Sequence, residues 1–157
     1  MINMKNKLLV VLALSAVAAC TPTTKKPSTA STTQSFAPDS IAYFENNVGD
    51  TVHFDFDKYN LNPSEKAMLD NQANWFTSNN TKVKASVEGH CDERGTREYN
   101  LALGERRAKS AQKYLVSKGV DANRLSVISY GKERPIAIGT DEASYGANRR
   151  AKTTIER

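Results

Sequence analysis

The residues best suited to bind a small molecule lie in one stretch, Gly89–Ala108, which reads GHCDERGTREYNLALGERRA. The pattern predicts that a strand ends here, that the charged loop Cys91–Arg97 follows, and that a long helix comes next. Asp92 supplies a carboxylate in the loop. Asn100 and Arg107 are seven residues apart in the helix, so at 3.6 residues per turn they share one face, about 10.5 Å apart along the axis. These side chains form a candidate site at a strand end, where ligand sites are common.

Asp92 and Arg107 would suit a ligand that carries charges of both signs. A guanidinium binds a carboxylate through two parallel hydrogen bonds, and a carboxylate accepts hydrogen bonds from an ammonium group. The free end of a diamino acid carries both groups and would satisfy the pair. One alternative stays open, namely that Asp92 and Arg107 form an internal salt bridge and bind no ligand.

Gly104 lies between Asn100 and Arg107 on the same predicted helix face. A glycine in the middle of a helix costs roughly 0.8–1 kcal/mol relative to alanine, so its presence indicates that space is needed there. Two explanations fit equally well. Either a ligand lies across Gly104, or the helix packs closely against another backbone at this position.

Catalytic and metal sites have little support in the sequence. His90, Cys91, Asp92 and Glu93 are residues of metal-binding types, but adjacent residues on a strand point to opposite faces. No second ligand cluster supplies the spacing of a zinc site. A nucleophile pair of Cys91 and His53 is conceivable, but nothing in the sequence positions it. We therefore expect no metal, no cofactor and no enzyme activity, with a hydrolase as the enzymatic alternative.

The elements that must position the site alternate between strand and helix periodicity. In Thr51–Phe56, the residues Val52, Phe54 and Phe56 alternate with polar ones, which predicts a strand with these three on one face. The predicted elements, in order, are a strand at Thr51–Phe56, a helix from the N-cap Asn62 and Pro63 to Asn79–Asn80, a strand at Lys82–His90, a helix at Glu98–Lys118 that stops at Gly119, a strand at Arg124–Tyr130, a short helix at Tyr145–Arg150 and a strand at Ala151–Glu156. This order predicts an α+β fold, a two-layer sandwich in which a small mixed sheet is covered by helices.

The N-terminal residues predict export and a lipid anchor. Lys5 and Lys7 precede an uncharged run of twelve residues, Leu8–Ala19, which is too short to span a bilayer, since that takes about 20 residues. A cationic start, a short apolar run and small residues before a cleavage point describe a signal peptide. Residues 17–20 (VAAC) resemble the bacterial lipobox, which implies that residues 1–19 are removed and that Cys20 is lipidated. The alternative is an ordinary secretory signal with an incidental cysteine.

A tether and one domain account for the remaining chain. Residues 20–40 are rich in Thr, Ser, Pro and Lys, cannot bury enough apolar surface to fold, and predict a flexible tether. The folded domain is expected at residues 41–157. A lipidated Cys20 leaves Cys91 without a disulfide partner. Without Lys5 and Lys7, the 22 basic residues fall to 20 against 17 acidic ones, a net charge of +3, so an exported chain with interleaved charges is not expected to bind nucleic acid.

Four motifs in a fixed order carry a family resemblance. GHCDERGTREYNLALGERRA, with VHFDFDKYNL (52–61) before it and SYGKERP (129–135) and YGANRRA (145–151) after it, resembles the OmpA-like C-terminal domains, and among them the peptidoglycan-associated lipoproteins of the Tol–Pal system. The resemblance covers roughly residues 41–157. It implies noncovalent binding of peptidoglycan through the meso-diaminopimelate of the stem peptide. The resemblance implies that the ligand-binding residues are those that match the family motifs, namely Asp57, Asp92, Asn100, Arg107, Arg149 and Arg150. Arg94 and Thr96 lie in the same loop as Asp92 and are implied as secondary contacts.

The resemblance also implies partners and a location. The implied location is the outer membrane, reached through the N-terminal lipid, with the domain facing the periplasm; Thr21 after the lipidated residue resembles an outer-membrane address. The implied partners are TolB and other Tol proteins, and the implied role is envelope integrity and cell division. The alternative is another OmpA-like peptidoglycan binder, associated with motility or secretion. Cys91 departs from the pattern, because the family tends to carry alanine or threonine at this position.

Overall fold

The computed structural model describes residues 36–78 and 80–156. The predicted signal peptide (1–19), Cys20 and most of the predicted tether (residues 20–35) lie outside the described residues. Within the described ranges, no helix is both long and apolar enough to cross a membrane. The first helix, α1 (Ile41–Tyr43), continues into a π-helical turn, Phe44–Val48, and neither was predicted.

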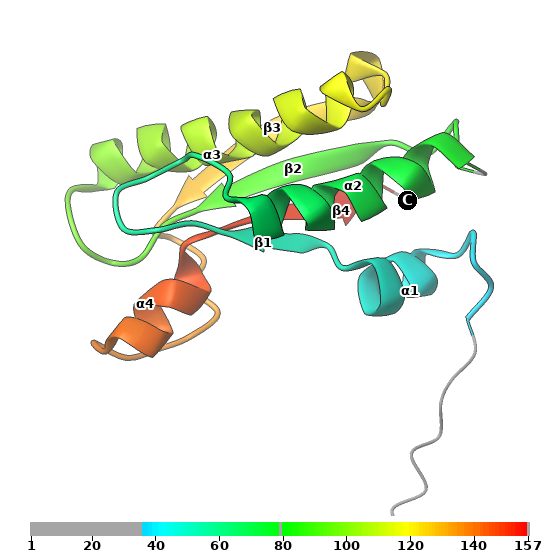
Figure 1. The fold of residues 1–157 in the computed structure, drawn as a ribbon. Coiled ribbons are helices and arrows are strands. Elements are labelled where there is room, and N and C mark those ends of the chain that lie inside the picture. Colours follow the sequence, from blue (N-terminus) through cyan, green and yellow to red (C-terminus); the bar gives the residue numbers. More distant parts are fainter. Residues whose placement is uncertain (1–35, 79, 157) are drawn as a thin grey trace, which may run out of the picture. The chain divides into compact units, whose positions relative to one another are not determined.

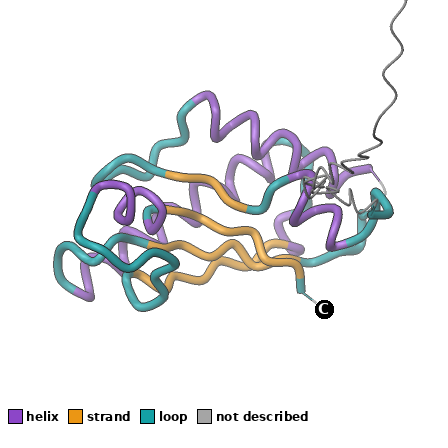
Figure 2. The backbone as a smooth tube through the Cα atoms, turned by 90° about the horizontal axis from the view of Figure 1, so that it is seen from below, coloured by secondary structure: helices purple, strands orange, loops and turns teal. Residues whose placement is uncertain are grey.

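A mixed four-stranded sheet forms one layer and two long helices form the other (Figures 1 and 2). The strands are β1 (Thr51–His53), β2 (Ala85–His90), β3 (Leu125–Gly131) and β4 (Arg150–Ile155), in the order β1-β4-β2-β3. The helices are α2 (Pro63–Ser78), α3 (Arg97–Ser117) and the short α4 (Glu142–Asn148). β2 and β3 are parallel, and α3 provides the crossover connection that parallel strands need, whereas β4 is antiparallel to β1 and β2. The predicted α+β two-layer sandwich is confirmed.

The core lies between the sheet and the two long helices. Phe44, Trp75 and Phe76 are buried, with ring centroids 4.7–5.7 Å apart, and they hold the π-helical turn against α2. Val87 on β2 and Leu115 on α3 are fully buried in the same cluster. The two helices are therefore fixed on the sheet by apolar packing, and the polar site lies at one end of that packed layer.

The predicted helix signals operate as expected. The Asn62 side chain accepts from the Glu65 N–H at 2.9 Å, and Pro63 is the first residue of α2. The Glu65 carboxylate accepts in turn from the His53 N–H at 2.9 Å, so the start of α2 is joined to the end of β1. Gly119 follows α3 with φ +97°, a left-handed conformation that glycine adopts at no steric cost.

The prediction that Phe56 belongs to a strand and shares one face with Val52 and Phe54 is wrong. β1 ends at His53, whose partner is Arg150, the first residue of β4. Beyond that pair one backbone hydrogen bond follows, from the Phe54 N–H to the Arg149 carbonyl at 2.9 Å. The chain then leaves the sheet and turns at Asp57, where φ is +57°. Phe56 is 57% exposed. The residue therefore belongs to the loop that borders the site and not to the core.

Several boundaries also differ from the predicted ones. β2 begins at Ala85 and not at Lys82, and β3 begins after a 3-10 turn, Ala122–Arg124. α4 begins at Glu142, three residues before the predicted start, because the Asp141 carboxylate caps it by accepting from the Ser144 N–H at 2.8 Å. α3 begins one residue earlier than predicted, at Arg97.

The backbones of β2 and α3 touch at Gly89 and Gly104. A Cβ atom on Gly89 would lie 1.8 Å from the Gly104 carbonyl oxygen, and a Cβ on Gly104 would lie 2.5 Å from Ser129 Oγ and 2.9 Å from the Gly89 oxygen. Both positions therefore require glycine. The two explanations offered for Gly104 are decided in favour of close backbone packing, so the prediction of a ligand lying across it is not supported.

Replacing Gly89 by alanine is expected to force α3 away from β2 and to lower the free energy of unfolding by about 2 kcal/mol or more. Gly146→Ala is the matched control, because a Cβ there lies 3.5 Å from its nearest neighbour, the Arg149 Nη2 atom, which is an ordinary contact. Urea unfolding followed by circular dichroism measures both. Equal midpoints for Gly89→Ala and Gly146→Ala would contradict the packing role of Gly89.

Candidate functional site

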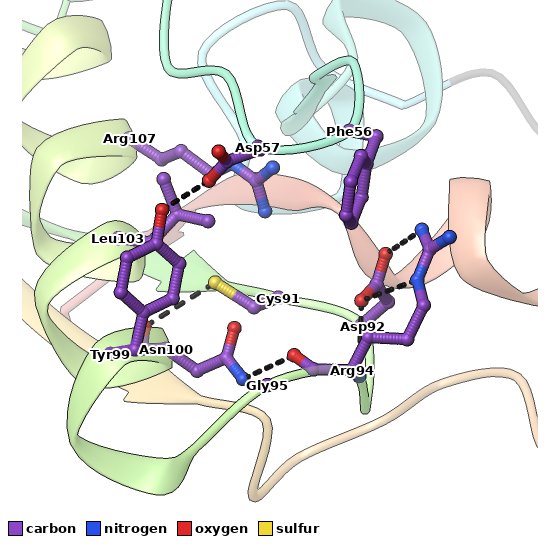
Figure 3. Close-up of a pocket in the computed structure, with 10 residues that line it drawn as sticks. All are labelled: Phe56, Asp57, Cys91, Asp92, Arg94, Gly95, Tyr99, Asn100, Leu103 and Arg107. Carbon is purple, nitrogen blue, oxygen red and sulfur yellow. Dashed lines mark hydrogen bonds and ion pairs between the residues drawn. The ribbon is translucent and has the colours of Figure 1, made fainter.

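A cavity of about 180 Å³ opens where β2 ends and α3 begins. One wall comes from the loop after β1, the floor from the loop after β2, and the other wall from α3 (Figure 3). The lining residues are Phe56, Asp57, Cys91, Asp92, Arg94, Gly95, Tyr99, Asn100, Leu103 and Arg107. Five of the predicted site residues, Asp57, Asp92, Arg94, Asn100 and Arg107, are among them.

Thr96 and Arg149, also predicted, lie beside the cavity and do not line it. Thr96 is the N-cap of α3, and its hydroxyl accepts from the Tyr99 N–H at 3.2 Å. Arg149 is buried behind Asp92, where its Nε donates to the Phe54 carbonyl at 2.9 Å. Arg150 points away from this group, with Nη2 donating to the Arg134 carbonyl at 3.2 Å. Thr96 and Arg149 therefore support the residues that line the cavity.

Arg107 is a fully buried cation held by backbone carbonyls. Its Nε donates to the backbone carbonyl of Lys58 at 2.8 Å, its Nη1 to that of His90 at 2.9 Å and its Nη2 to that of Asp55 at 3.1 Å. These contacts use three of the five N–H donors of a guanidinium, so two remain. Burial lowers the pKa of Arg107, and the nearby Cys91 and Asp92 oppose that effect. Because arginine does not deprotonate in proteins, the side chain presents a fixed positive charge.

Asp92 pairs with Arg94 and Arg149, so the predicted alternative of an Asp92–Arg107 salt bridge is wrong. Its Oδ1 accepts from the Arg94 backbone N–H and from Arg94 Nε, both at 3.2 Å, and its Oδ2 from Arg94 Nη2 at 2.5 Å. Arg149 Nη1 lies 3.5 Å from Oδ2. Burial of Asp92 tends to raise its pKa, but the hydrogen bonds from Arg94 outweigh burial and lower the pKa overall. Asp92 is therefore a carboxylate at neutral pH.

Asn100 fixes the loop between Asp92 and α3. Its Nδ2 donates to the carbonyls of Arg94 at 2.8 Å and of Thr96 at 3.1 Å, and the side chain is buried. The loop turns between these two residues at Gly95, where φ is +89°. Figure 3 shows Asn100 on the α3 side of the cavity with its amide nitrogen turned to the Arg94 carbonyl, which leaves the amide oxygen to accept from a ligand.

Asp57 lies on the opposite wall in a strained conformation. It is the one non-glycine residue with positive φ in the described part of the chain, and such conformations cost about 1 kcal/mol or more and concentrate at functional sites. The Tyr99 hydroxyl donates to Asp57 Oδ1, and this bond raises the pKa of Tyr99, with burial adding to the effect. The pair joins the loop after β1 to α3 across the mouth of the cavity (Figure 3).

Cys91 lies in the floor of the cavity as a neutral thiol. It is 3% exposed, and its Sγ lies 3.3 Å from the Asn100 carbonyl oxygen. Burial raises the pKa of the thiol more than the nearby Arg107 lowers it. A protonated thiol is a poor nucleophile, so Cys91 acts here as a small apolar surface. The described residues also include no group of three or more His, Cys, Asp or Glu side chains that could hold a metal ion.

The cavity therefore combines a fixed cation, a carboxylate and two apolar walls. Arg107 and Asp92 lie on different sides of it, and Phe56 and Leu103 provide apolar contact (Figure 3). A small ligand with an ammonium group and a carboxylate on an aliphatic chain matches this distribution.

The sequence-based prediction missed several residues of the site. Tyr99 and Leu103 follow the spacing of Arg107 at intervals of four, which places all three on one face of α3. That spacing could have revealed them. Phe56 was assigned to a strand by its alternating pattern. Glu142 and Tyr145 lie on α4, distant in sequence, and contact Arg94; their proximity follows only from the path of the chain before β4.

Comparison with known proteins identifies a family. The model of the OmpA family matches residues 53–149. The chain is 48% identical over 118 residues to the peptidoglycan-associated lipoprotein of Rhizobium meliloti, covering 75% of this chain and 66% of the relative. It is 42% identical over 144 residues to that of Haemophilus influenzae, covering 92% and 93%. The crystal structure of the peptidoglycan-associated lipoprotein from Burkholderia pseudomallei superposes with a TM-score of 0.70 at 37% identity, covering 76% of this chain and all of that one.

Arg107→Leu is expected to lower the free energy of unfolding by about 2–4 kcal/mol, because it leaves three backbone carbonyls without their donor. Arg106→Leu is the matched control, since Arg106 lies over the exposed rings of Tyr59 and Tyr99 at 5.6 and 5.9 Å and is expected to matter by less than about 0.5 kcal/mol. Urea titrations measure both; equal losses would overturn the structural role of Arg107.

Proposed function

Because the chain belongs to the OmpA family, we propose that it binds peptidoglycan noncovalently, through the meso-diaminopimelate of the stem peptide. The observation that carries this proposal is that Asp92 and Arg107 line the same cavity. The free end of diaminopimelate has an ammonium group and a carboxylate on one carbon and an aliphatic chain behind them. Those three features correspond to the carboxylate, the guanidinium and the apolar walls of the cavity.

In this proposal Arg107 binds the ligand carboxylate. Two of its N–H donors are not engaged by the Lys58, His90 and Asp55 carbonyls, and a charge-assisted pair of hydrogen bonds is stronger than a neutral one. Because the guanidinium is already desolvated and fixed, binding requires no further ordering of this side chain.

Asp92 accepts from the ligand ammonium, and the remaining residues position the two charged groups. Asn100 offers its amide oxygen as a further acceptor. Asp57 holds the loop after β1 against Tyr99, Thr96 starts α3 at the correct residue, and Arg149 lies behind Asp92. The relatives named above share the name peptidoglycan-associated lipoprotein, which supports binding of this class of ligand.

We further propose that the chain joins the outer membrane to the cell wall. Lipidation of Cys20 anchors it, the domain faces the periplasm, and TolB and other Tol proteins are its protein partners in envelope integrity and cell division. Support comes from the lipobox-like residues 17–20 and from the relatives' names. A tether of 20 residues has a relaxed span of about 25 Å and a fully extended reach of about 66 Å, so the domain can stand away from the membrane surface.

Sedimentation with purified sacculi tests the binding proposal. Asp92→Asn keeps the shape of the side chain without its charge, and Arg107→Lys keeps the charge without the planar fork, so each is expected to weaken binding at least about tenfold. Arg106→Leu is expected to sediment like the wild type. Circular dichroism verifies that each variant is folded. Sedimentation of Asp92→Asn and Arg107→Lys to the wild-type extent would refute the assignment of both residues.

Affinity purification from the native envelope tests the partner proposal. TolB is expected to co-purify with the chain, whereas an OmpA-like protein of a motility or secretion system would not retain it. Retention of sacculi without TolB would leave peptidoglycan binding intact and remove the assignment to the Tol–Pal system.

A further inference from the structure

The Arg94 side chain lines the cavity on the side of Asp92 (Figure 3). Its guanidinium carbon lies 4.1 Å from the centre of the Phe56 ring and 4.2 Å from that of the Tyr145 ring, so it lies between two aromatic faces, which attract cations. Two of its nitrogens also donate to the two oxygens of Asp92. Figure 3 shows Arg94 reaching back from its own loop to Asp92. Asp92 and the two rings therefore form a subsite for a positively charged group.

A second carboxylate lies next to this subsite. Glu142 Oε2 is 4.0 Å from Arg94 Nη1, and Glu142 Oε1 is 2.6 Å from Arg149 Nη2. Glu142 is 68% exposed at its side chain and Arg94 is 35% exposed, whereas Asp92 and Arg149 are buried. Asp92 and Arg149 are thus the fixed pair of the group, and Arg94 and Glu142 are the pair at the solvent side.

We propose that Arg94 occupies the place of the ligand ammonium, and that binding exchanges the Arg94 guanidinium on Asp92 for that ammonium. This inference rests on the proposed diaminopimelate binding and adds to it the residue that sets selectivity for an amine. Both cations need the same environment, namely one carboxylate with an aromatic face beside it. A ligand without an ammonium group cannot replace Arg94, because Asp92 would then keep only the 3.5 Å contact with Arg149 as its cationic partner.

The surrounding contacts lower the free energy needed to displace Arg94 from Asp92. Displaced from Asp92, the Arg94 guanidinium still has Glu142 within reach, so one ion pair replaces another and no cation is left unpaired. Asp92 keeps the Arg149 contact and the hydrogen bond from the Arg94 backbone N–H, so the carboxylate stays oriented. Asn100 holds the Arg94 carbonyl, so the exchange moves the side chain and leaves the loop backbone in place.

Isothermal titration of the full-length chain in detergent with two probes tests the exchange. The probes are meso-diaminopimelate and pimelate, which has the same seven-carbon dicarboxylate chain without the amines. Arg94→Gln removes the competing cation and is expected to lower the Kd for meso-diaminopimelate about two- to fivefold, the range of a partly exposed ion pair. It is expected not to improve pimelate binding. Arg97→Gln is the control, since Arg97 pairs with Glu133 at 3.2 Å on the exposed side of α3.

A second variant follows the displaced side chain. Glu142→Gln removes the carboxylate that would receive Arg94, so it is expected to weaken meso-diaminopimelate binding about twofold or more in the wild-type background. In the Arg94→Gln background the same substitution is expected to have a smaller effect, because no guanidinium then needs a new partner. Thermal unfolding of each variant verifies that the fold is unchanged.

The outcomes separate the exchange from the proposed function. Weaker meso-diaminopimelate binding by a folded Arg94→Gln, with wild-type binding intact, would overturn the exchange alone and make Arg94 a direct ligand contact. Equal improvement for pimelate would overturn the selectivity role. If the wild type bound neither meso-diaminopimelate nor sacculi, the proposed function would fail and the exchange with it.

Discussion

The site depends on the burial of one guanidinium. A charge taken out of water must be compensated by hydrogen bonds at fixed positions, and Arg107 meets that requirement with carbonyls from the loop after β1 and from the end of β2. Those carbonyls are in place only if the chain leaves the sheet after His53 and turns sharply. The left-handed backbone of Asp57 follows from this demand. The compensation of Arg107 thus joins three separate segments and thereby shapes the cavity that they enclose.

A second constraint sets the distance between α3 and the sheet. Gly89 and Gly104 lack the Cβ atoms that would hold the two backbones apart, so the middle of α3 rests directly on β2. Asn100 lies one turn before that contact and Arg107 nearly one turn after it. Asn100 therefore reaches the loop after β2. Arg107 reaches carbonyls of the loop after β1 and the carbonyl at the end of β2. The glycine that the sequence presents as a possible ligand surface acts instead as the spacer that places the ligand-facing residues on either side of it.

The extent of prediction from sequence follows from the range of the forces involved. Periodicity and capping act over a few residues, so the strands, the Asn62 cap and the Gly119 stop could be predicted. The family motifs also led to five residues that line the candidate cavity. The pairing of charges could not be predicted in this way. The sequence offered Arg94, Arg107 and Arg149 as partners for Asp92, and only the folded chain shows that Arg94 and Arg149 contact it. The strand prediction for Phe56 was wrong for a related reason. The alternating pattern continues beyond His53, whose partner Arg150 is the first residue of β4.

The contrast between the arginines explains how one cavity can be both rigid and selective. Arg107 is fixed by three carbonyls and Arg149 by Phe54 and two carboxylates, whereas Arg94 lies at the solvent side. A site of this kind gives up part of its affinity, because its own cation competes with the ligand. On the proposed membrane anchor that loss matters little. The proposed tether, with a relaxed span of about 25 Å for a flexible chain of its length, would keep the domain near the cell wall at high effective concentration. Modest affinity at each site would then be enough, and attachment would stay reversible.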